Sequence, residues 1–417
     1  MQIAVIGAGI VGVTTAFELA RDGHQVTVFE RRASVAEETS FANAGVVAPG
    51  YITPWAAPGM PAKVLRHLLS RQAPLRLALP MAPGQLGWMW RWWRACQAPV
   101  FAANRAHLYR LAHYSQQRLR GLTQDLQLTH ESSAGYLVLL RSARELAQAR
   151  ASLKLLAELG VDFHLVSGAR ARDIERGLNP AMPLHAALHL PQDEVGNCRQ
   201  FALMLKDIAR SQGVDFQFNT TVASIDVAQK ATLFVADTHS RTTPTPVSCD
   251  AIVVCAGAAS TQLCKPLGKK LPIASIYGYS VSAHIREPLD APRAALMDEH
   301  YKVAISRLGN RVRVAGSAEI GGRHDTKRLS AMRTLYKVLQ DWFPGAALMS
   351  HGVQEWKGAR PMLANRPPII GASGLPGLWF NTGHGSSGWA LGCGSARLLA
   401  DAVAGRSAGI DTVPYQY

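Results

Sequence analysis

Three glycines near the N-terminus have the spacing of a turn that binds a phosphate-bearing cofactor. Gly7, Gly9 and Gly12 are separated by one and by two residues, and Glu30 follows 18 residues after Gly12. A glycine at the first position permits a tight turn, one at the second lets the backbone approach a pyrophosphate, and one at the third allows close helix–strand packing. A terminal acid accepts hydrogen bonds from ribose hydroxyls. The four residues together indicate a dinucleotide site.

The elements around these glycines are those that a dinucleotide site requires. Residues 3–6 are an apolar, partly β-branched run typical of a buried parallel strand. Residues 13–20 have a helical pattern, and 24–29 form a second strand that ends at Glu30. The pyrophosphate is expected at the helix N-terminus, where free N–H groups point. A glycine-rich turn in another α/β fold is the alternative interpretation. The predicted cofactor contacts in this region are Gly7, Gly9, Ile10, Val11, Gly12, Glu30 and Arg31.

Four further segments bear on which dinucleotide binds. Residues 38–45 are small and polar, 216–222 form a strand whose end could clasp an adenine, and 250–258 form a strand that runs into a glycine turn. Residues 378–389 combine a strand, a glycine-rich loop and a helix start, which would stabilise negative charge on a reduced flavin ring. An NAD enzyme would not need this last turn, so the pattern favours FAD. The predicted contacts are Thr39, Ser40, Asn43, Ala44, Gly45, Val222, Ala256, Gly257, Gly383, His384, Gly385, Ser386, Ser387 and Gly388.

With these motifs in place, the chain resembles the FAD-dependent D-amino-acid oxidase/glycine oxidase superfamily nearly end to end. It is most similar to the small-subunit type of bacterial D-amino acid dehydrogenase. The resemblance is carried by Glu38-Thr39-Ser40 with Asn43-Ala44-Gly45, by 49–51 with 54–59, and by 381–385 with Gly388-Trp389. It implies a Rossmann-like FAD-binding domain with an interleaved α+β substrate domain built on a mainly antiparallel sheet.

The resemblance also implies an activity. Such enzymes hold FAD tightly, oxidise D-amino acids by hydride transfer from Cα to flavin N5, and release 2-oxo acids and ammonia. Electrons pass to a respiratory acceptor, a quinone or another carrier. The chain departs from the family pattern at 363–368 and at Tyr277-Gly278-Tyr279-Ser280, where the family often has Lys-Gly-Tyr-Ser. Two alternatives therefore stay open: an enzyme acting on a cyclic or N-substituted amino acid of the D-proline or hydroxyproline type, and a non-catalytic flavin-binding subunit.

Four residues are candidates for the catalytic site. Binding of an α-carboxylate calls for a planar bidentate donor, and in the family the arginine matching Arg360 grips it. Tyr279 and Tyr301 could add hydroxyl donors, or be half-buried strand tyrosines. His384 could contact the flavin ring or line the pocket, or be a loop histidine bonded to backbone. Oxidation by a flavin needs orientation more than acid–base groups, because the cofactor carries the chemistry.

The segments expected to contact FAD are scattered, so the domains are expected to be discontinuous. A helical period covers 101–126, a capping box at Ser142–Glu145 opens a helix that Gly160 closes, and Gly309-Asn310 joins two strands as in a hairpin. The predicted division is FAD-binding 1–85, 193–268 and 356–417, and substrate domain 86–192 and 269–355.

The composition of the chain limits the classes of partner that it is expected to bind. The chain has 44 lysines and arginines against 29 acids, a net charge of +15, which favours anionic partners such as a membrane surface or an acidic cofactor. The six cysteines form no C-x-x-C pair, the histidines show no metal-ligand spacing, and no nucleic-acid module is present.

With no signal-peptide pattern, we expect a cytoplasmic location. Residues 88–94 hold four tryptophans and two arginines, which fits either internal packing or peripheral contact with the inner face of the plasma membrane.

Overall fold

A six-stranded sheet is built around the N-terminal strand. The fold is that of a computed structural model, which describes residues 1–67, 75–77, 83–240 and 242–417. The sheet is parallel except for its edge strand β18, which pairs antiparallel with β19. Strand β1 lies between β2 and β12, and its residues 3–6 are buried, as expected for a central strand covered on both faces. The order is β18 (Ile369–Ala372), β19 (Leu378–Thr382), β12 (Ala251–Val254), β1 (Gln2–Ile6), β2 (Gln25–Phe29) and β8 (Asp215–Gln217).

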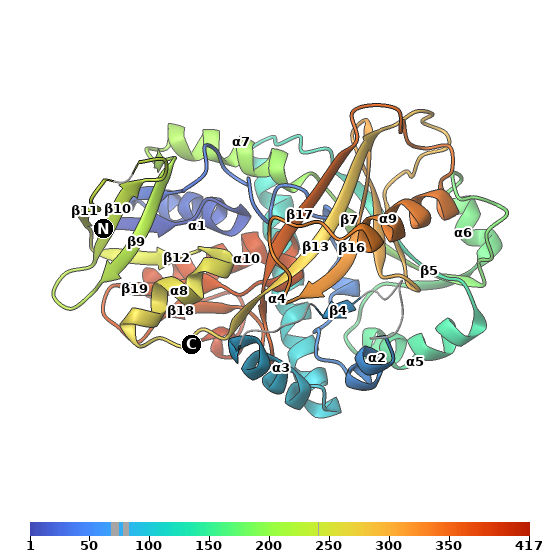
Figure 1. Cartoon of the computed structure of the whole chain (residues 1–417), viewed down its shortest axis with the longest axis horizontal. Helices are drawn as coiled ribbons and strands as arrows, with labels where there is room; N and C mark the ends of the chain where they lie inside the picture. Colours follow the sequence, from blue (N-terminus) through green and yellow to red (C-terminus); the bar gives the residue numbers. More distant parts are fainter. Residues whose placement is uncertain (68–74, 78–82, 241) are drawn as a thin grey trace.

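Different elements cover the two faces of this sheet (Figure 1). One face packs on α1 (Ile10–Arg21), α7 (Cys198–Ser211) and α10 (Gly388–Val403), with α4 (Ala98–Asp125) beside α10. The other face packs on α8 (Ser260–Cys264) and on a small antiparallel sheet of β9 (Thr220–Asp226), β10 (Thr232–Asp237) and β11 (Thr245–Ser248).

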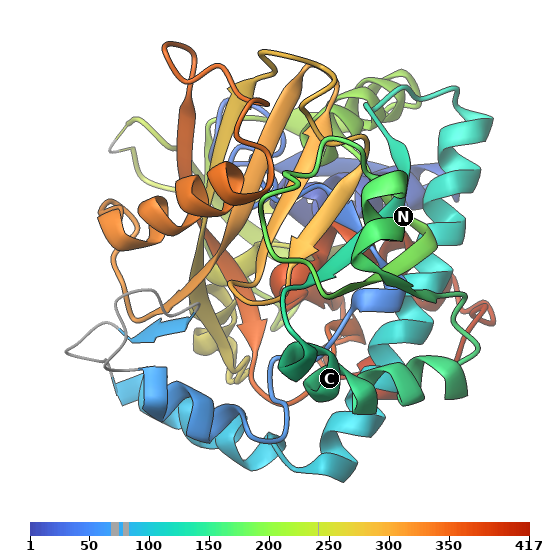
Figure 2. The same ribbon diagram turned by 90° about the vertical axis from the view of Figure 1, so that its right-hand side faces the viewer.

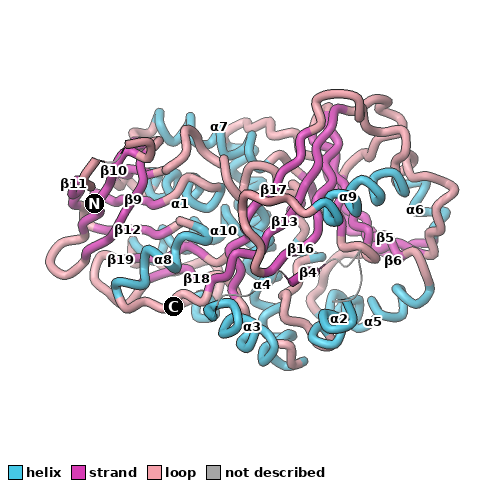
Figure 3. Tube along the Cα trace, viewed as in Figure 1, coloured by secondary structure: helices cyan, strands magenta, loops and turns pink. Residues whose placement is uncertain are grey.

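A larger, mainly antiparallel sheet forms the second half of the molecule, seen on the right of Figures 1 and 3. Among the described strands, only the β5–β14 and β4–β16 pairs are parallel. The Rossmann-like and mainly antiparallel halves confirm the predicted fold class. The path runs β17 (Gln354–Leu363), β13 (Ile273–His284), β16 (Arg311–Ile320), β15 (Val303–Leu308), β14 (Ala295–Asp298), β5 (Ser133–Leu140), β7 (Ala186–Val195) and β3 (Val46–Val47), with β4 (Leu75–Leu77) on β16 and β6 (His164–Ser167) on β7.

Helices flank the large sheet. Helix α9 (Leu329–Trp342) packs its apolar face on β13 and β16, and the fully buried Trp342 lies in that core. Figure 2 shows α4 running along one side of the molecule, with α3 near its lower end. The other helices of this half are α2 (Met60–His67), α3 (Pro83–Ala95), α5 (Ala143–Glu158) and α6 (Gly168–Ile174).

Most predicted elements are present. Ser142 caps α5, its hydroxyl accepting a hydrogen bond from the Glu145 amide, and Gly309-Asn310 joins β15 to β16. The strand expected at 216–222 is wrong in one respect, because it breaks at Phe218-Asn219. Asn219 has a φ of +52°, so the chain turns there and leaves the six-stranded sheet for the three-stranded one.

The chain passes between the two large sheets several times. Strands β3 and β17 pair within the ten-stranded sheet, although the predicted boundaries at 85 and 356 assign all of β3 and most of β17 to the FAD-binding part. We propose keeping the interleaved division while counting these two strands with the large sheet.

Candidate active site

A single cavity of about 2500 Å³ receives both glycine-rich turns. Its walls include Gly7 and Gly9 of the first turn and Gly383–Gly388 of the last, together with residues 358–361 of β17. A pocket for a small ligand is typically about 300–1,000 Å³, so this space admits a ligand much larger than an amino acid. The two distant ends of the sequence therefore enclose one binding space.

The first turn has the geometry that a dinucleotide needs. Gly7 has a φ of +99°, and a Cβ there would lie 2.9 Å from the Cys255 carbonyl oxygen. A Cβ on Gly12 would lie 1.8 Å from the Gly7 carbonyl oxygen, so Gly12 does not line the cavity but lets α1 pack against the turn. The Glu30 carboxylate accepts hydrogen bonds from the amides of Ala8 (2.7 Å) and Arg32 (2.9 Å), and burial raises the pKa of Glu30 despite these bonds.

The loop at residues 43–45 is held by donors from three elements. The Arg313 guanidinium donates to the Asn43 carbonyl (3.1 Å), and the Ser306 hydroxyl donates to the Ala44 carbonyl (2.7 Å). The Trp389 indole donates to the Gly45 carbonyl (3.1 Å). Asn43 and Ala44 line the cavity, whereas Gly45, with a φ of +73°, turns the chain behind them.

The polar residues before this loop also contact other walls. The Thr39 hydroxyl donates to the Ala359 carbonyl (2.5 Å), and Ser40 accepts a hydrogen bond from the Ile10 amide (3.0 Å). Arg31 pairs with Glu38 at 2.5 Å. The other predicted contacts that line the cavity are Val11, Val222, Ala256, Gly257, Gly383, Gly385, Ser386, Ser387 and Gly388.

His384 is a buried neutral imidazole in the wall of the cavity. It is 6% exposed, and its Nε2 lies 2.9 Å from the Ser395 hydroxyl oxygen. Because the Ser395 hydroxyl donates to the Gly392 carbonyl (3.1 Å), the imidazole must donate, which places the ring hydrogen on Nε2. Burial lowers the pKa of His384 to about 3.

Arg360 lies half-buried on β17 and lines the cavity. Its Nη1 donates to the Ser317 carbonyl (2.9 Å), and among the described residues no carboxylate pairs with it. Ser317 has a φ of +57°, a strained conformation that accompanies this contact. Burial lowers the pKa of Arg360 to about 10, which leaves the guanidinium charged near neutral pH.

The two predicted tyrosines differ in their surroundings. Tyr279 lines the cavity, but its hydroxyl donates to Glu319, which also accepts from Lys357 (2.9 Å). Burial is the main cause that raises the pKa of Tyr279, and Glu319 adds to it. Tyr301 is not among the residues that line the cavity; its ring packs under the Arg141 guanidinium, 5.2 Å away. We therefore do not retain Tyr301 as a catalytic candidate.

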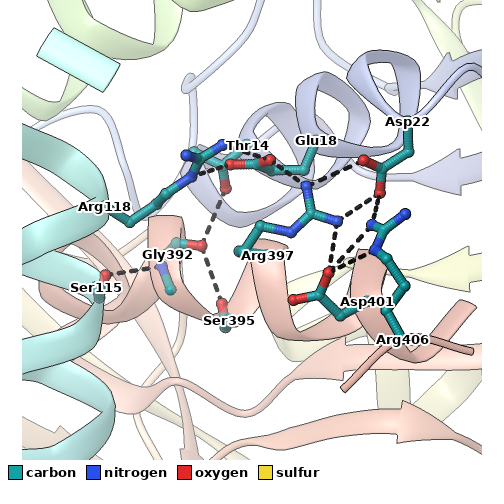
Figure 4. A network of polar contacts seen from close by, with 11 residues as sticks. Thr14, Glu18, Asp22, Ser115, Arg118, Gly392, Ser395, Arg397, Asp401 and Arg406 are labelled. Carbon is teal, nitrogen blue, oxygen red and sulfur yellow. Dashed lines mark hydrogen bonds and ion pairs between the residues drawn. The ribbon is translucent and has the colours of Figure 1, made fainter. Parts of the chain in front are cut away.

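A buried ion-pair network ties together the helices that start at the two turns (Figure 4). Glu18 of α1 accepts hydrogen bonds from Arg118 of α4 (2.6 Å) and Arg397 of α10 (2.8 Å). Arg397 also pairs with Asp22 and, at 3.0 Å, with Asp401. Since α1 begins at the first turn and α10 at the last, the network fixes one wall of the cavity relative to the other.

Sequence reasoning noted the stretch 277–280 but did not assign a role to Gly278, which lies against Arg360. A Cβ on Gly278 would lie 2.3 Å from Arg360 Nη2, and Gly278 pairs in register with Gly358 across β13 and β17. The absence of a side chain at Gly278 thus leaves room for the guanidinium. The signal in the sequence was the pair of glycines, which becomes informative only once the two strands are known to be neighbours.

Comparison with known proteins shows which family has this architecture. A family model described as FAD dependent oxidoreductase matches residues 2–402. The chain belongs to this family. Its cofactor is accordingly FAD, and the residues present fit that group, because glycines at the first turn leave the backbone open and Glu30 stands at the end of β2 for the ribose.

Relatives within the FAD-dependent oxidoreductase family match over nearly their full length. A D-amino acid dehydrogenase of Rhizorhabdus wittichii is 40% identical over 414 residues, which is 99% of this chain and 98% of that one. A D-amino acid dehydrogenase of Vibrio cholerae is 39% identical over 97% of this chain and 95% of that one. Among solved structures, glycine oxidase from Geobacillus kaustophilus shares the fold with a TM-score of 0.76 at 19% identity, covering 99% of this chain and 97% of that one.

Proposed function

We propose that this chain is an FAD-dependent D-amino acid dehydrogenase that yields 2-oxo acids and ammonia. The observation that carries the proposal is Arg360, a guanidinium that lines the cavity and pairs with no carboxylate among the described residues. The full-length relatives named D-amino acid dehydrogenase support the same activity.

The residues around the cavity would orient the substrate. Arg360 would bind the α-carboxylate with two parallel hydrogen bonds, and its bond to the Ser317 carbonyl would hold the guanidinium plane. His384 is neutral and already bonded to Ser395, so it adds shape without adding charge. FAD, when bound, supplies the acceptor for the hydride that leaves Cα. The imine formed is then hydrolysed by water.

Anaerobic reduction by enantiomeric amino acids tests this function. The purified flavoprotein is expected to lose its yellow absorbance with D-alanine or D-methionine and to keep it with the L-enantiomers. Bleaching only by D-proline or N-methyl amino acids would replace the proposal with the cyclic or N-substituted alternative. A flavoprotein that no amino acid bleaches would instead be a non-catalytic subunit.

We further propose that the electrons pass to a respiratory quinone and that α3 makes the membrane contact. Among the described residues, no helix has the length and apolarity needed to cross a bilayer. On α3, Trp88 and Trp92 are buried, so packing accounts for those two. Trp90 and Trp93, by contrast, are 58% and 52% exposed, and their ring centroids are 5.0 Å apart. Tryptophans of this kind, with Arg91 and Arg94 near them, suit the headgroup region of an anionic bilayer.

Vesicle sedimentation tests the membrane contact. Full-length holoenzyme should sediment with phosphatidylglycerol vesicles and much less with phosphatidylcholine vesicles, and the W90A/W93A double variant should stay in the supernatant. Equal sedimentation of wild type and double variant would remove α3 from the contact. Turnover with a soluble quinone in the absence of oxygen would support the acceptor, and turnover with oxygen alone would contradict it.

A further inference from the structure

A second guanidinium in the cavity has no partner in the part of the chain that the structure describes. Arg105 on α4 is 2% exposed and belongs to the cavity wall, together with Ala98 and Phe101 of the same helix. No hydrogen bond or ion pair joins it to another described residue, and its Nη1 is enclosed without an acceptor. Burying a cation without a partner costs free energy, so Arg105 is expected to destabilise the fold unless a ligand pairs with it.

Among the residues that the structure describes, none pairs a negative charge with Arg105. Tyr51 faces it, and the Tyr51 hydroxyl donates to Glu299 (2.7 Å) and accepts from Lys302 (3.2 Å). Because Glu299 also pairs with Lys302, its negative charge is already balanced within this group. Tyr136, whose ring centroid is 5.7 Å from that of Tyr51, has a buried hydroxyl without a partner. This end of the cavity thus holds an unpaired guanidinium and a free hydroxyl. The nearby carboxyl group of Asp193 accepts a hydrogen bond from the Gly50 amide (3.3 Å), and burial raises the pKa of Asp193 to about 7.

The other lysines and arginines of the cavity wall differ from Arg105. Arg144 is exposed, and the rest except Arg360 have an acidic partner, for example Lys357 with Glu319. Among the described, non-exposed residues of the wall, only Arg105 and Arg360 present a guanidinium without a carboxylate. They come from different elements, α4 and β17. The cavity therefore offers two separate positions for oxyanions.

We propose that Arg105 forms a second anion subsite, which binds the side-chain carboxylate of an acidic D-amino acid. The proposal rests on the proposed function, in which Arg360 binds the α-carboxylate. A guanidinium and a carboxylate match in a bidentate arrangement, and the Tyr136 hydroxyl can donate a third hydrogen bond. The subsite would make dicarboxylic D-amino acids better substrates than their amides, which have the same shape without the charge.

Kinetics with matched substrates tests the subsite. For wild-type holoenzyme, kcat/KM should be higher with D-glutamate or D-2-aminoadipate than with D-glutamine. Arg105→Met should lower kcat/KM for the preferred dicarboxylate on the order of 100-fold and change that for D-alanine by less than about threefold. Arg110→Met, at an exposed arginine on the same helix, should match wild type with every substrate. Wild-type preference for D-glutamine, or an equal loss on D-alanine in Arg105→Met, would overturn the proposal.

A binding measurement separates this inference from the proposed function. Calorimetric titration of oxidised holoenzyme with glutarate and with butyrate should show tighter glutarate binding, and Arg105→Met should remove that difference while retaining its flavin absorbance. Arg360→Met should instead raise KM for all D-amino acids, acidic or not. If the wild type oxidises no D-amino acid but still prefers glutarate through Arg105, the function fails and the subsite stands. If glutarate and butyrate bind alike, the subsite fails whatever the activity.

Discussion

The Arg360 guanidinium lies directly against Gly278 on the neighbouring strand. A Cβ on Gly278 would lie 2.3 Å from Nη2 and 2.5 Å from Cζ of Arg360, closer than any real contact. The two strands pair in register, with Ile276 opposite Arg360 and Gly278 opposite Gly358. One position without a side chain therefore decides where the guanidinium that we propose as the carboxylate-binding group can lie.

Gly278→Ala is accordingly expected to displace the Arg360 guanidinium. Apparent KM for D-alanine should rise about tenfold or more, because a misplaced guanidinium loses bidentate geometry. Steady-state kinetics measures the effect, and flavin absorbance should be unchanged. Ala274→Gly, a change four residues away on the same strand, serves as the control. A Gly278→Ala enzyme with wild-type KM would show that the guanidinium has other room.

Arg360 itself should contribute about 2–4 kcal/mol to substrate binding, as expected for a charge-assisted bidentate pair. Arg360→Met should therefore raise KM by roughly 30- to 1000-fold, and Arg360→Lys should recover only part of this, because an ammonium cannot reproduce the fork. Steady-state kinetics with D-alanine measures both variants. If KM is the same in all three proteins, the carboxylate is bound elsewhere.

The lowered pKa of the buried His384 imidazole should make the stability of the fold depend on pH. Its pKa is about 3 in the folded chain, against an ordinary value of 6.5, because the ring is buried. Between those values the unfolded chain binds a proton that the folded chain does not, so acid favours unfolding. His384→Asn should lose stability less steeply than wild type between pH 7 and pH 4, measured by urea unfolding at each pH. Parallel curves for the two proteins would mean that the imidazole takes up its proton over the same pH range in the folded and unfolded chains.

The network around Glu18 should be a major contributor to stability. Glu18→Gln removes the buried carboxylate that two partly buried guanidiniums share, and breaking a buried pair in this way costs about 3–5 kcal/mol. The exposed pair of Arg170 and Asp173 is the control, since Asp173→Asn should cost less than about 1 kcal/mol. Thermal unfolding compares them. Equal melting temperatures for Glu18→Gln and Asp173→Asn would contradict the assignment.

Local sequence patterns predicted the first turn well. Gly7, Gly12 and Glu30 follow one another within a single strand–helix–strand unit, so their roles depend on short-range geometry that spacing reveals. The residues at which helices and strands end were harder to predict. Asn219 breaks the expected strand through a left-handed conformation, which asparagine tolerates but does not require.

Residues that depend on contacts between distant strands could not be predicted in the same way. Tyr301 follows a strand and precedes another, and nothing in the sequence around it shows that its ring packs against Arg141 instead of lining the cavity. Arg105 is one of many arginines in the sequence, and only the fold shows that it is buried without a partner. The sequence shows that such residues are present, but only the fold shows which residues surround them.

The order of the strands also bears on how the protein acquires its cofactor during synthesis. Strand β1 pairs with β12, and β12 in turn pairs with β19, so the sheet around the first turn needs strands from late in the sequence. The last glycine-rich turn lies within the final 40 residues of the 417-residue chain. A ribosome-bound chain that ends before residue 378 carries the first phosphate-binding bend but lacks the opposite wall. Flavin loading must therefore wait until residues 378–388 have been synthesised, and a chain truncated before residue 378 would be a colourless protein.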